Sequence, residues 1–419
     1  MRITLLMIAF AAMFSSGAAA QTVIIHANLI DGTGAPPQRD VTIVMEGGRI
    51  AAIGPSAQVA VPAGAAVVDA AGKFVVPGII NAHGHVGPPP RDQQLRQYAL
   101  YGVTTTTGMY FDQDDIVAFK AAQRAGDLRG ARILTVKYRF MSPPFIPGSE
   151  TKTPEEGRAK VDEIVAHGAD FVKVWIDAQN GKYPKLTREF CAAVLDQARK
   201  HGKITMAHVF EYEDAKMIVD EGVNILAHNV RDAVIEDDFI AKLKARNVTV
   251  ISTLAREEAM FVFADEPAFI DTPFFQKGLS AERLAQLRTK RRDEQKNDPT
   301  LAANRRAFEI DKINLKKLSD AGARIALGTD SGGDLNRFFI QGFFEHRQME
   351  LMVAAGLTPM QVIQAFSRNA SEALGIDKEF GTLAVGKAAD LLLVAKNPLD
   401  DIANMHDIAA VYLGGKAFE

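Results

Sequence analysis

The sequence of 419 residues contains one cysteine, Cys191, which excludes an intramolecular disulfide framework and a cysteine-rich metal site. Basic residues are not in excess, because 48 Lys and Arg stand against 51 Asp and Glu, for a formal net charge of −3. The chain therefore lacks the charge balance of a nucleic-acid-binding protein. It has 47% hydrophobic and 24% charged residues, a composition typical of a globular protein with a large core.

The first 20 residues have the pattern of a cleaved secretory signal peptide. Arg2 provides the positive start, Ile3–Phe14 is apolar, and a segment of small residues ends at Ala20. A membrane anchor is the alternative, but the apolar run is shorter than the roughly 20 residues that a bilayer span needs. No later segment has 18 consecutive uncharged apolar residues. We therefore expect an exported chain, periplasmic or secreted, that is not attached to a membrane after signal cleavage.

The order of strand-like and helix-like segments predicts a barrel with one accessory β domain. Residues 21–76 are rich in short β patterns, residues 77–376 alternate apolar strands with amphipathic helices, and β patterns return in residues 377–419. The strand candidates of the alternating part are residues 74–80, 102–106, 132–136, 171–175, 204–207, 224–227, 249–253 and 324–327. Eight parallel strand–helix units are typical of a closed (β/α)8 TIM barrel. We expect an α/β protein in which both chain ends form one small β-sandwich domain beside this barrel.

One segment interrupts the alternation. Residues 261–306 lie between the seventh and eighth strand candidates and are too long for a bare connection. A helical pattern extends over residues 281–320 and includes the charged run at residues 290–294. Two interpretations stay open for the segment: a solvent-facing helical surface, or a lid over the barrel mouth.

Residues with metal-binding or acid–base chemistry recur at the strand ends, where the active sites of TIM barrels lie. His83 and His85 follow the first strand, and residues two apart in a strand face the same side, so both can bind one ion. Lys173 lies inside the apolar fourth strand, where a charged amine is costly without a partner. The fifth, sixth and eighth strands are followed by His208, His228 and Asp330. These six residues predict a metal site at the barrel mouth.

This pattern resembles the metal-dependent amidohydrolase superfamily over nearly all of the mature chain. The most specific shared motifs are Pro77–His85, Gly102–Thr105, Gly328–Ser331 and Gly381–Leu391. Similarity to the branch that contains imidazolonepropionase-like proteins and Xaa-Pro dipeptidases lies in Val172–Val174, Leu357–Pro359 and Ala365–Ala370.

The resemblance implies a binuclear metal centre. It assigns one divalent ion to His83, His85 and Asp330, a second to His208 and His228, and a bridge between them to Lys173 carboxylated by CO2. Two such ions would share a bridging hydroxide that attacks the substrate at neutral pH. Asp330 would move the proton to the leaving nitrogen, with His228 as the second catalytic candidate. Imidazole and carboxylate ligands without thiolate suit Zn2+, although Mn2+ or Co2+ would also fit.

The expected reaction is hydrolysis of an amide bond in a small molecule, foremost a dipeptide or an N-acyl amino acid. Cyclic amides, lactones and organophosphates at the same metals are alternatives, and so is a binding protein without turnover. Tyr138, Arg139 and Arg231 follow the third and sixth strands and are candidates for holding a substrate carboxylate. Ala227 and Asn229, on either side of the sixth-strand histidine, depart from residues common in the family and affect the substrate class more than metal binding. The sequence is also compatible with a homo-oligomer.

Overall fold

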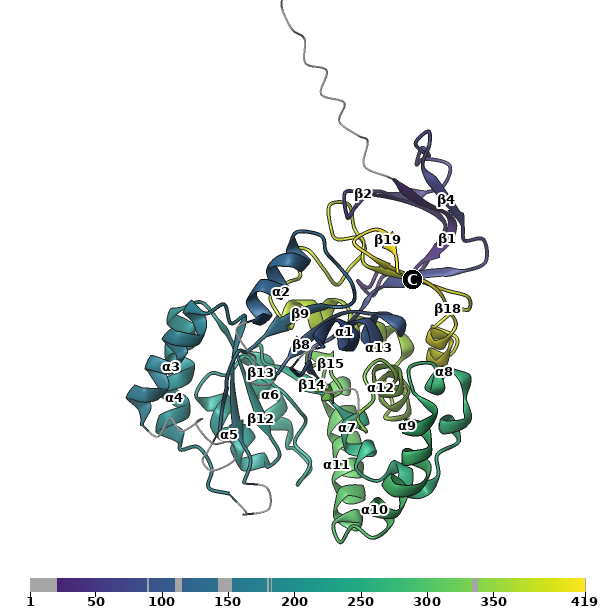
Figure 1. Cartoon of the computed structure of the whole chain (residues 1–419). Helices are drawn as coiled ribbons and strands as arrows, with labels where there is room; N and C mark the ends of the chain where they lie inside the picture. Colours follow the sequence, from purple (N-terminus) through teal and green to yellow (C-terminus); the bar gives the residue numbers. More distant parts are fainter. Residues whose placement is uncertain are drawn as a thin grey trace, which may run out of the picture.

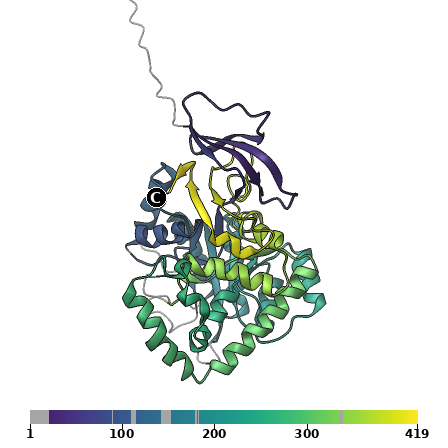
Figure 2. The ribbon, with the colours of Figure 1, turned by 90° about the vertical axis from the view of Figure 1, so that its right-hand side faces the viewer.

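The computed structural model describes residues 21–88, 90–109, 115–141, 153–178, 181, 183–333 and 338–418, so the predicted signal peptide lies outside the described residues. A strand-rich part with both chain ends lies above a helix-covered barrel (Figure 1). A second view shows the purple N-terminal strands beside yellow C-terminal strands (Figure 2). Among the described helices, none is both long and apolar enough to cross a bilayer.

Both ends of the chain contribute to one hydrogen-bonded sheet. Its strands are β1 (Thr22–Leu29), β2 (Gln38–Glu46), β3 (Arg49–Pro55), β4 (Ala66–Asp69), β5 (Phe74–Pro77), β17 (Leu391–Val394), β18 (Ile408–Leu413) and β19 (Lys416–Ala417). Their order is β19-β18-β17-β5-β1-β2-β3, with β4 beside β1. Alternate residues of β2, namely Val41, Ile43 and Met45, face a separate apolar core of this sheet. The predicted β domain built from both chain ends is therefore confirmed.

Eight parallel strand positions form the barrel. They are β6 (Ile79–Asn81), β8 (Val103–Gly108), β9 (Arg132–Thr135) continued by β10 (Arg139–Phe140), β11 (Phe171–Ile176), β12 (Ile204–Val209), β13 (Ile225–Leu226), β14 (Thr249–Ser252) and β15 (Ile325–Leu327). The Ala82 N–H donates to the Leu327 carbonyl at 2.9 Å, which joins the last strand to the first. Two short strands, β7 (Gly84–His85) and β16 (Ser331–Gly332), pair where these two strands end. The predicted (β/α)8 barrel is confirmed.

Helices surround the barrel. These helices are α1 (Arg91–Leu100), α2 (Asp115–Arg124), α3 (Pro154–Ala166), α4 (Arg188–Lys200), α5 (Tyr212–Asp220), α6 (Asp237–Ala245), α7 (Leu254–Ala259), α11 (Leu301–Asp320), α12 (Phe343–Ala354), α13 (Pro359–Phe366) and α14 (Arg368–Ala373). Local sequence explains where they begin. Helix α3 has a capping box between Thr153 and Glu156, with Pro154 in its first turn. Helix α4 begins after Thr187, whose hydroxyl accepts a hydrogen bond from the Phe190 N–H.

The first predicted strand, residues 74–80, is two strands of different sheets. Strand β5 ends at Pro77 in the sheet of the chain ends, and β6 starts at Ile79 in the barrel. Gly78 separates them, and a Cβ there would come within 2.3 Å of the Thr104 side chain. The prediction of one continuous strand is wrong, because an apolar run carries no mark of the point at which it passes between sheets.

The segment 261–306 contains several short helices. They are η1 (Val262–Asp265), η2 (Ala268–Asp271), α8 (Pro273–Gln276), α9 (Ala281–Gln286), the π-helical η3 (Leu287–Arg291) and α10 (Arg292–Lys296). The prediction of one helix over 281–320 is wrong, because Pro299 interrupts the chain between α10 and α11. Phe275 is fully buried against Phe343, with ring centroids 4.7 Å apart, so the segment is anchored on the barrel. Its function as a lid stays a prediction.

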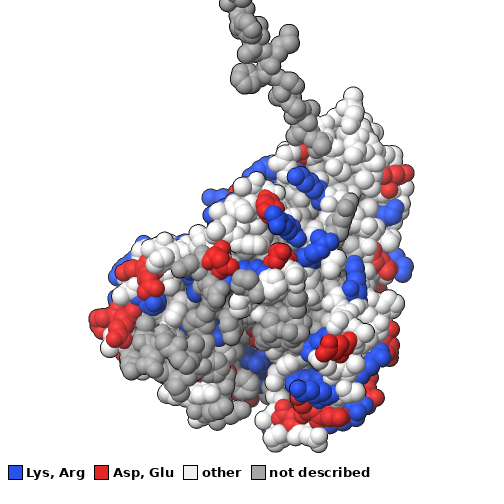
Figure 3. Space-filling view, viewed as in Figure 1, with Lys and Arg blue, Asp and Glu red and all other residues white. Residues whose placement is uncertain are grey.

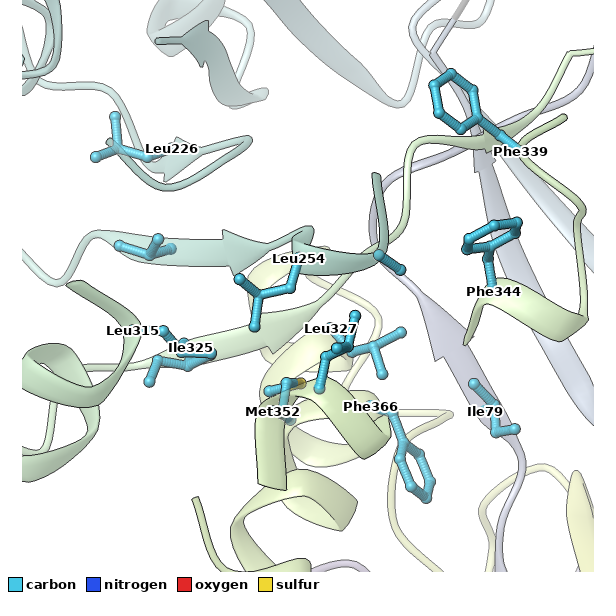
Figure 4. Packing of buried hydrophobic residues seen from close by; sticks show 14 of the residues in the cluster. Ile79, Leu226, Leu254, Leu315, Ile325, Leu327, Phe339, Phe344, Met352 and Phe366 are labelled. Carbon is cyan, nitrogen blue, oxygen red and sulfur yellow. The ribbon is translucent and has the colours of Figure 1, made fainter. Parts of the chain in front are cut away.

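The barrel has two apolar cores, one outside its strands and one inside. The larger core lies between the strands and the helices, and in Figure 4 Leu254, Leu327 and Met352 point toward one another there. A second core lines the inside of the barrel and includes Ile80 and Met206. Apolar side chains therefore fill this part of the interior.

Surface charges of both signs are mixed. On the described part of the face in Figure 3, blue and red side chains lie side by side. On α11, for example, the ammonium of Lys316 lies 2.5 Å from a carboxylate oxygen of Asp320, one helical turn away. Such exposed pairs contribute little to stability individually.

Candidate active site

The alternation of β11 directs Lys173 into the barrel. Phe171, two residues earlier, belongs to the apolar core inside the barrel, whereas Val172 and Val174 belong to the core between strands and helices. Lys173 is 2% exposed, and its Nζ lies 2.8 Å from His83 Nε2. The lysine of the fourth strand and a histidine of the first strand thus meet inside the barrel.

Three of the predicted ligands form a compact cluster. In His83, His85 and Asp330, one potential ligand atom of each residue lies within 4.8 Å of the others. Asp330 Oδ1 is 2.6 Å from His85 Nε2 and 3.6 Å from His83 Nε2. Asp330 has a φ of 55°, which is uncommon for a residue with a side chain, and its N–H donates to the His83 carbonyl at 2.7 Å. This backbone contact holds the end of the eighth strand against the first and brings the carboxylate to the histidines.

His208 and His228 extend the cluster to the fifth and sixth strands. The ring centroid of His228 lies 4.5 Å from that of His208 and 4.5 Å from that of His83. His228 Nδ1 is 2.8 Å from the Thr253 hydroxyl, and His208 Nε2 is 3.1 Å from Asp177 Oδ2. Asp177 and Thr253 were not predicted as site residues, although each directly follows a strand. The structure therefore brings all six predicted ligand residues into one contiguous group, in which Asp330 is half-buried and the other five are buried.

Burial sets the protonation of this group. It lowers the pKa of the Lys173 amine to about 7, and the charge of Asp330 only partly opposes this effect. Burial also lowers the pKa of His208 to about 3 and holds the pKa of His228 well below its usual range. For Asp330 burial would raise the pKa, but the contacts with His85 and the other histidines hold it well below the ordinary value. Neutral imidazoles and an ionised carboxylate are the forms that bind divalent cations.

A buried polar network behind the histidines was missed by the sequence analysis. The side-chain oxygen of Asn81 accepts from the His83 N–H at 3.0 Å, and its amide donates to Glu345 Oε1 at 2.5 Å. The hydroxyls of Thr329 and Ser331 each donate to the same oxygen at 2.7 Å. Glu345, on α12, is fully buried and connects the ends of the first and eighth strands. Asn81 lies within a recognised motif, but a glutamate in a helix gives no sequence signal of burial.

The three predicted substrate contacts lie in different places. Arg139 is 6% exposed, and its guanidinium lies 4.6 Å from the ring centroid of Trp175, which itself packs on a ligand histidine. Tyr138 points the other way, toward the helices, with its ring edge-on to Phe140. Arg231 is 1% exposed and donates to backbone carbonyls. Of these three residues, Arg139 is placed beside the cluster, and the placement of Tyr138 and Arg231 does not support their predicted contact with a substrate.

Asp311 of α11 is buried behind the end of the sixth strand. Its Oδ1 accepts a hydrogen bond from the Asn229 amide at 2.5 Å. Burial, assisted by the charge of Glu257, raises the pKa of Asp311 from 3.8 to about 7. Between these values the folded protein binds more protons at this group than the unfolded chain does. The stability contributed by the protonated carboxyl is therefore lost as pH rises through this window.

Asp311→Asn keeps an oxygen that can accept the hydrogen bond of the Asn229 amide, but it has no carboxyl group that titrates. We therefore expect the variant to lack the part of the pH-dependent loss of stability that is due to Asp311. The free energy of unfolding, measured with urea at about pH 5 and about pH 8, should fall less between the two conditions in the variant than in the wild type. An identical pH dependence in both proteins would show that Asp311 does not titrate in this range.

Comparisons with known proteins place the chain in a family. The model of the amidohydrolase family matches residues 74–418, and the chain therefore belongs to the amidohydrolase family. A crystal structure of a Bifidobacterium longum protein assigned to the prolidases is similar with a TM-score of 0.78 at 25% identity, over 96% of this chain and 95% of that one. A Xaa-Pro dipeptidase with bound methionine has a TM-score of 0.75 at 20% identity, over 96% and 100% of the two chains. Imidazolonepropionase of Arthrobacter sp. (strain FB24) is 28% identical over 184 residues, 41% of this chain and 42% of its own.

These similarities confirm the predicted resemblance to the branch with imidazolonepropionase-like proteins and Xaa-Pro dipeptidases. The chain is a hydrolase that acts on carbon–nitrogen bonds. Members of this family generally depend on metal, and His83, His85 and Asp330 could hold an ion here.

Proposed function

We propose that this chain is an exported, metal-dependent amidohydrolase of small molecules, foremost of dipeptides or N-acyl amino acids. The observation that carries the proposal is the convergence of four buried histidines, one buried lysine and one half-buried aspartate from five strands on one group. The similarity to a prolidase and a Xaa-Pro dipeptidase supports the dipeptide class. The N-terminal pattern of residues 1–20 supports export to the periplasm or the medium.

The donor set fits two divalent ions. His83, His85 and Asp330 would hold one ion, His208 and His228 the second, and carboxylated Lys173 would bridge them. Among the described residues, His228 Nε2 is buried without a hydrogen-bond partner, while the other ring nitrogen, Nδ1, contacts the Thr253 hydroxyl. A buried lone pair of this kind is costly unless a ligand takes it. Imidazole and carboxylate ligands without thiolate suit Zn2+ best, and Mn2+ or Co2+ also fit.

Lys173 is suited to carboxylation because its amine is buried and readily deprotonated. The neutral Nζ adds to CO2, a nitrogen–carbon bond forms, and one proton is released to solvent. The product is an anionic group with two oxygens, which removes the cost of burying an ammonium. The lowered pKa of Lys173, about 7, makes the reactive neutral amine available at neutral pH.

The acid–base steps belong to side chains of the cluster. When bound, the metal ions would lower the pKa of a water molecule and polarise the scissile carbonyl. Asp330 directs Oδ1 to the histidines, and its Oδ2 lies 3.5 Å from Arg256 Nε. We assign to the Asp330 carboxylate the proton transfer from the attacking water to the leaving nitrogen. His228 is the second candidate for this transfer or for polarising the carbonyl.

Arg139 is the candidate that would hold a substrate carboxylate. Its guanidinium is fixed over Trp175, and it pairs in register with Lys173 of the neighbouring strand. A guanidinium held in this way loses little further freedom when it pairs with a carboxylate.

Metal content tests the binuclear site. Purified protein is expected to contain about two transition-metal ions per chain, which elemental analysis measures directly. A reproducible value near one in fully active protein would contradict the second site.

A substrate screen tests the reaction. Dipeptides and N-acyl amino acids should be hydrolysed faster than the matching amides without a free carboxylate, because the latter cannot pair with Arg139. Preferred turnover of lactones or phosphotriesters would replace the amide assignment, and a metal-loaded protein without turnover of any class would indicate a binding protein.

A further inference from the structure

Residues at the start of α7 contact His228, which is assigned to the second ion, and Asp330, which is assigned to the first. Thr253, the residue before the helix, interacts with His228 Nδ1, as described above. Arg256 and Glu257 follow in the first turn of the helix. Glu257 is 3% exposed. The role inferred for Glu257 and its two arginine partners rests on the proposed metal-dependent function.

Arg231 connects Glu257 to the strands that carry His208 and His228. Its Nη1 donates to the carbonyl of Val209 at 2.8 Å and to the carbonyl of Asn229 at 3.1 Å. These two residues directly follow the histidines in the chain. The Nε of Arg231 lies 3.0 Å from Glu257 Oε1. Glu257 is therefore the carboxylate in direct contact with a guanidinium that is 1% exposed, and removing it would leave a buried charge without that partner.

Arg256 connects Glu257 to Asp330. Its Nη1 donates to both carboxylate oxygens of Glu257 at 2.9 Å. Its Nε lies 3.5 Å from Asp330 Oδ2, whereas the other carboxylate oxygen of Asp330, Oδ1, contacts His85 Nε2. One carboxylate thus holds two arginines, of which one contacts the ends of the fifth and sixth strands and the other contacts the eighth-strand ligand.

We propose that Glu257, with Arg231 and Arg256, is a positioning network that fixes Asp330 relative to His208 and His228. The three residues would act through the ligands rather than touch substrate. Their loss would loosen the spacing between the two ion positions. Residues that orient metal ligands typically contribute about 10–100-fold to metal affinity.

The next residue in the same helix provides a matched control. Glu258 is 5% exposed and makes a two-pronged ion pair with Arg347 of α12, with distances of 2.8 Å and 2.6 Å. Glu258→Gln removes an equivalent buried charge without touching the ligands. Zn2+ is titrated into chelator-treated full chain against a chromogenic chelator, and thermal unfolding of the metal-free proteins is recorded in parallel.

Glu257→Gln is expected to weaken binding of at least one Zn2+ by about 10–100-fold, whereas Glu258→Gln should bind as the wild type does. Both variants should lose thermal stability in the metal-free form. Equal Zn2+ affinity in the two variants would overturn the positioning role and leave Glu257 as a stabilising ion pair. A wild type that binds no Zn2+, Mn2+ or Co2+ would overturn the proposed function itself, and the network with it.

Arg256 keeps the inference testable if Glu257→Gln does not fold. Its side chain is 24% exposed, so its replacement is less disruptive to folding. Arg256→Gln should weaken Zn2+ binding, and Arg256→Lys should restore part of the affinity because it keeps the positive charge near Asp330. Wild-type affinity in Arg256→Gln would contradict the network.

Discussion

Lys173→Ala is expected to lose most of its activity, at least about 10–100-fold in kcat, since it removes the group proposed to bridge both ions. A short-chain carboxylic acid added to the variant should restore part of the activity. Removal of the lysine side chain leaves a buried space next to His83 Nε2. A small carboxylate that enters this space can supply the two oxygens of the missing carbamate. Activity measured against acid concentration, together with metal content, checks both parts of this expectation.

Lys120→Ala is the matched control for this experiment. Lys120 is also buried, at 6% exposure, but its ammonium pairs with Asp170 outside the site. Its replacement should lower stability, with no loss of kcat that a carboxylic acid repairs. Full activity of Lys173→Ala without any additive would refute the bridging role.

Asp330→Asn is expected to lower kcat by about 10²–10⁴ while the protein retains measurable metal. The amide of Asn keeps an oxygen that can serve as a ligand, but it cannot accept the proton of the attacking water. Because the pKa of Asp330 is held well below its ordinary value, the carboxylate is ionised at neutral pH, which is the form that the proton transfer requires. The variant should therefore also show a flatter acidic limb in the pH–rate profile.

Asp214→Asn provides the comparison for this substitution. Asp214, on α5, pairs with Lys185 at 2.8 Å rather than with one of the six predicted ligands, so its loss should change kcat far less than the loss of the Asp330 carboxylate does. If Asp330→Asn keeps its metal and loses less than about tenfold in kcat, the proton-transfer assignment is wrong. His228 would then become the better candidate for that step.

The ligand residues could be predicted because each lies at a position that the sequence defines locally. His83 and His85 follow an apolar run, and Lys173 interrupts one, so the period of two residues along a strand was enough to predict their direction. Eight such runs with helices between them predicted that the strand ends meet in a barrel. The spacing of neighbouring strands then brought residues far apart in sequence into one group.

Local sequence patterns were enough to predict most strands and helices of the barrel, the family and the side chains that meet at the barrel mouth. The polar residues that support those side chains became visible only in the folded chain. Glu345 and Glu257 lie on helices, where an acidic residue alone predicts a solvent-facing position, yet both are buried against partners from other elements. Arg231, predicted from the sequence as a substrate contact, is likewise buried, and its partners are two backbone carbonyls and a carboxylate from separate segments. Burial and ion pairing depend on contacts between segments distant in the chain, and no local pattern encodes them.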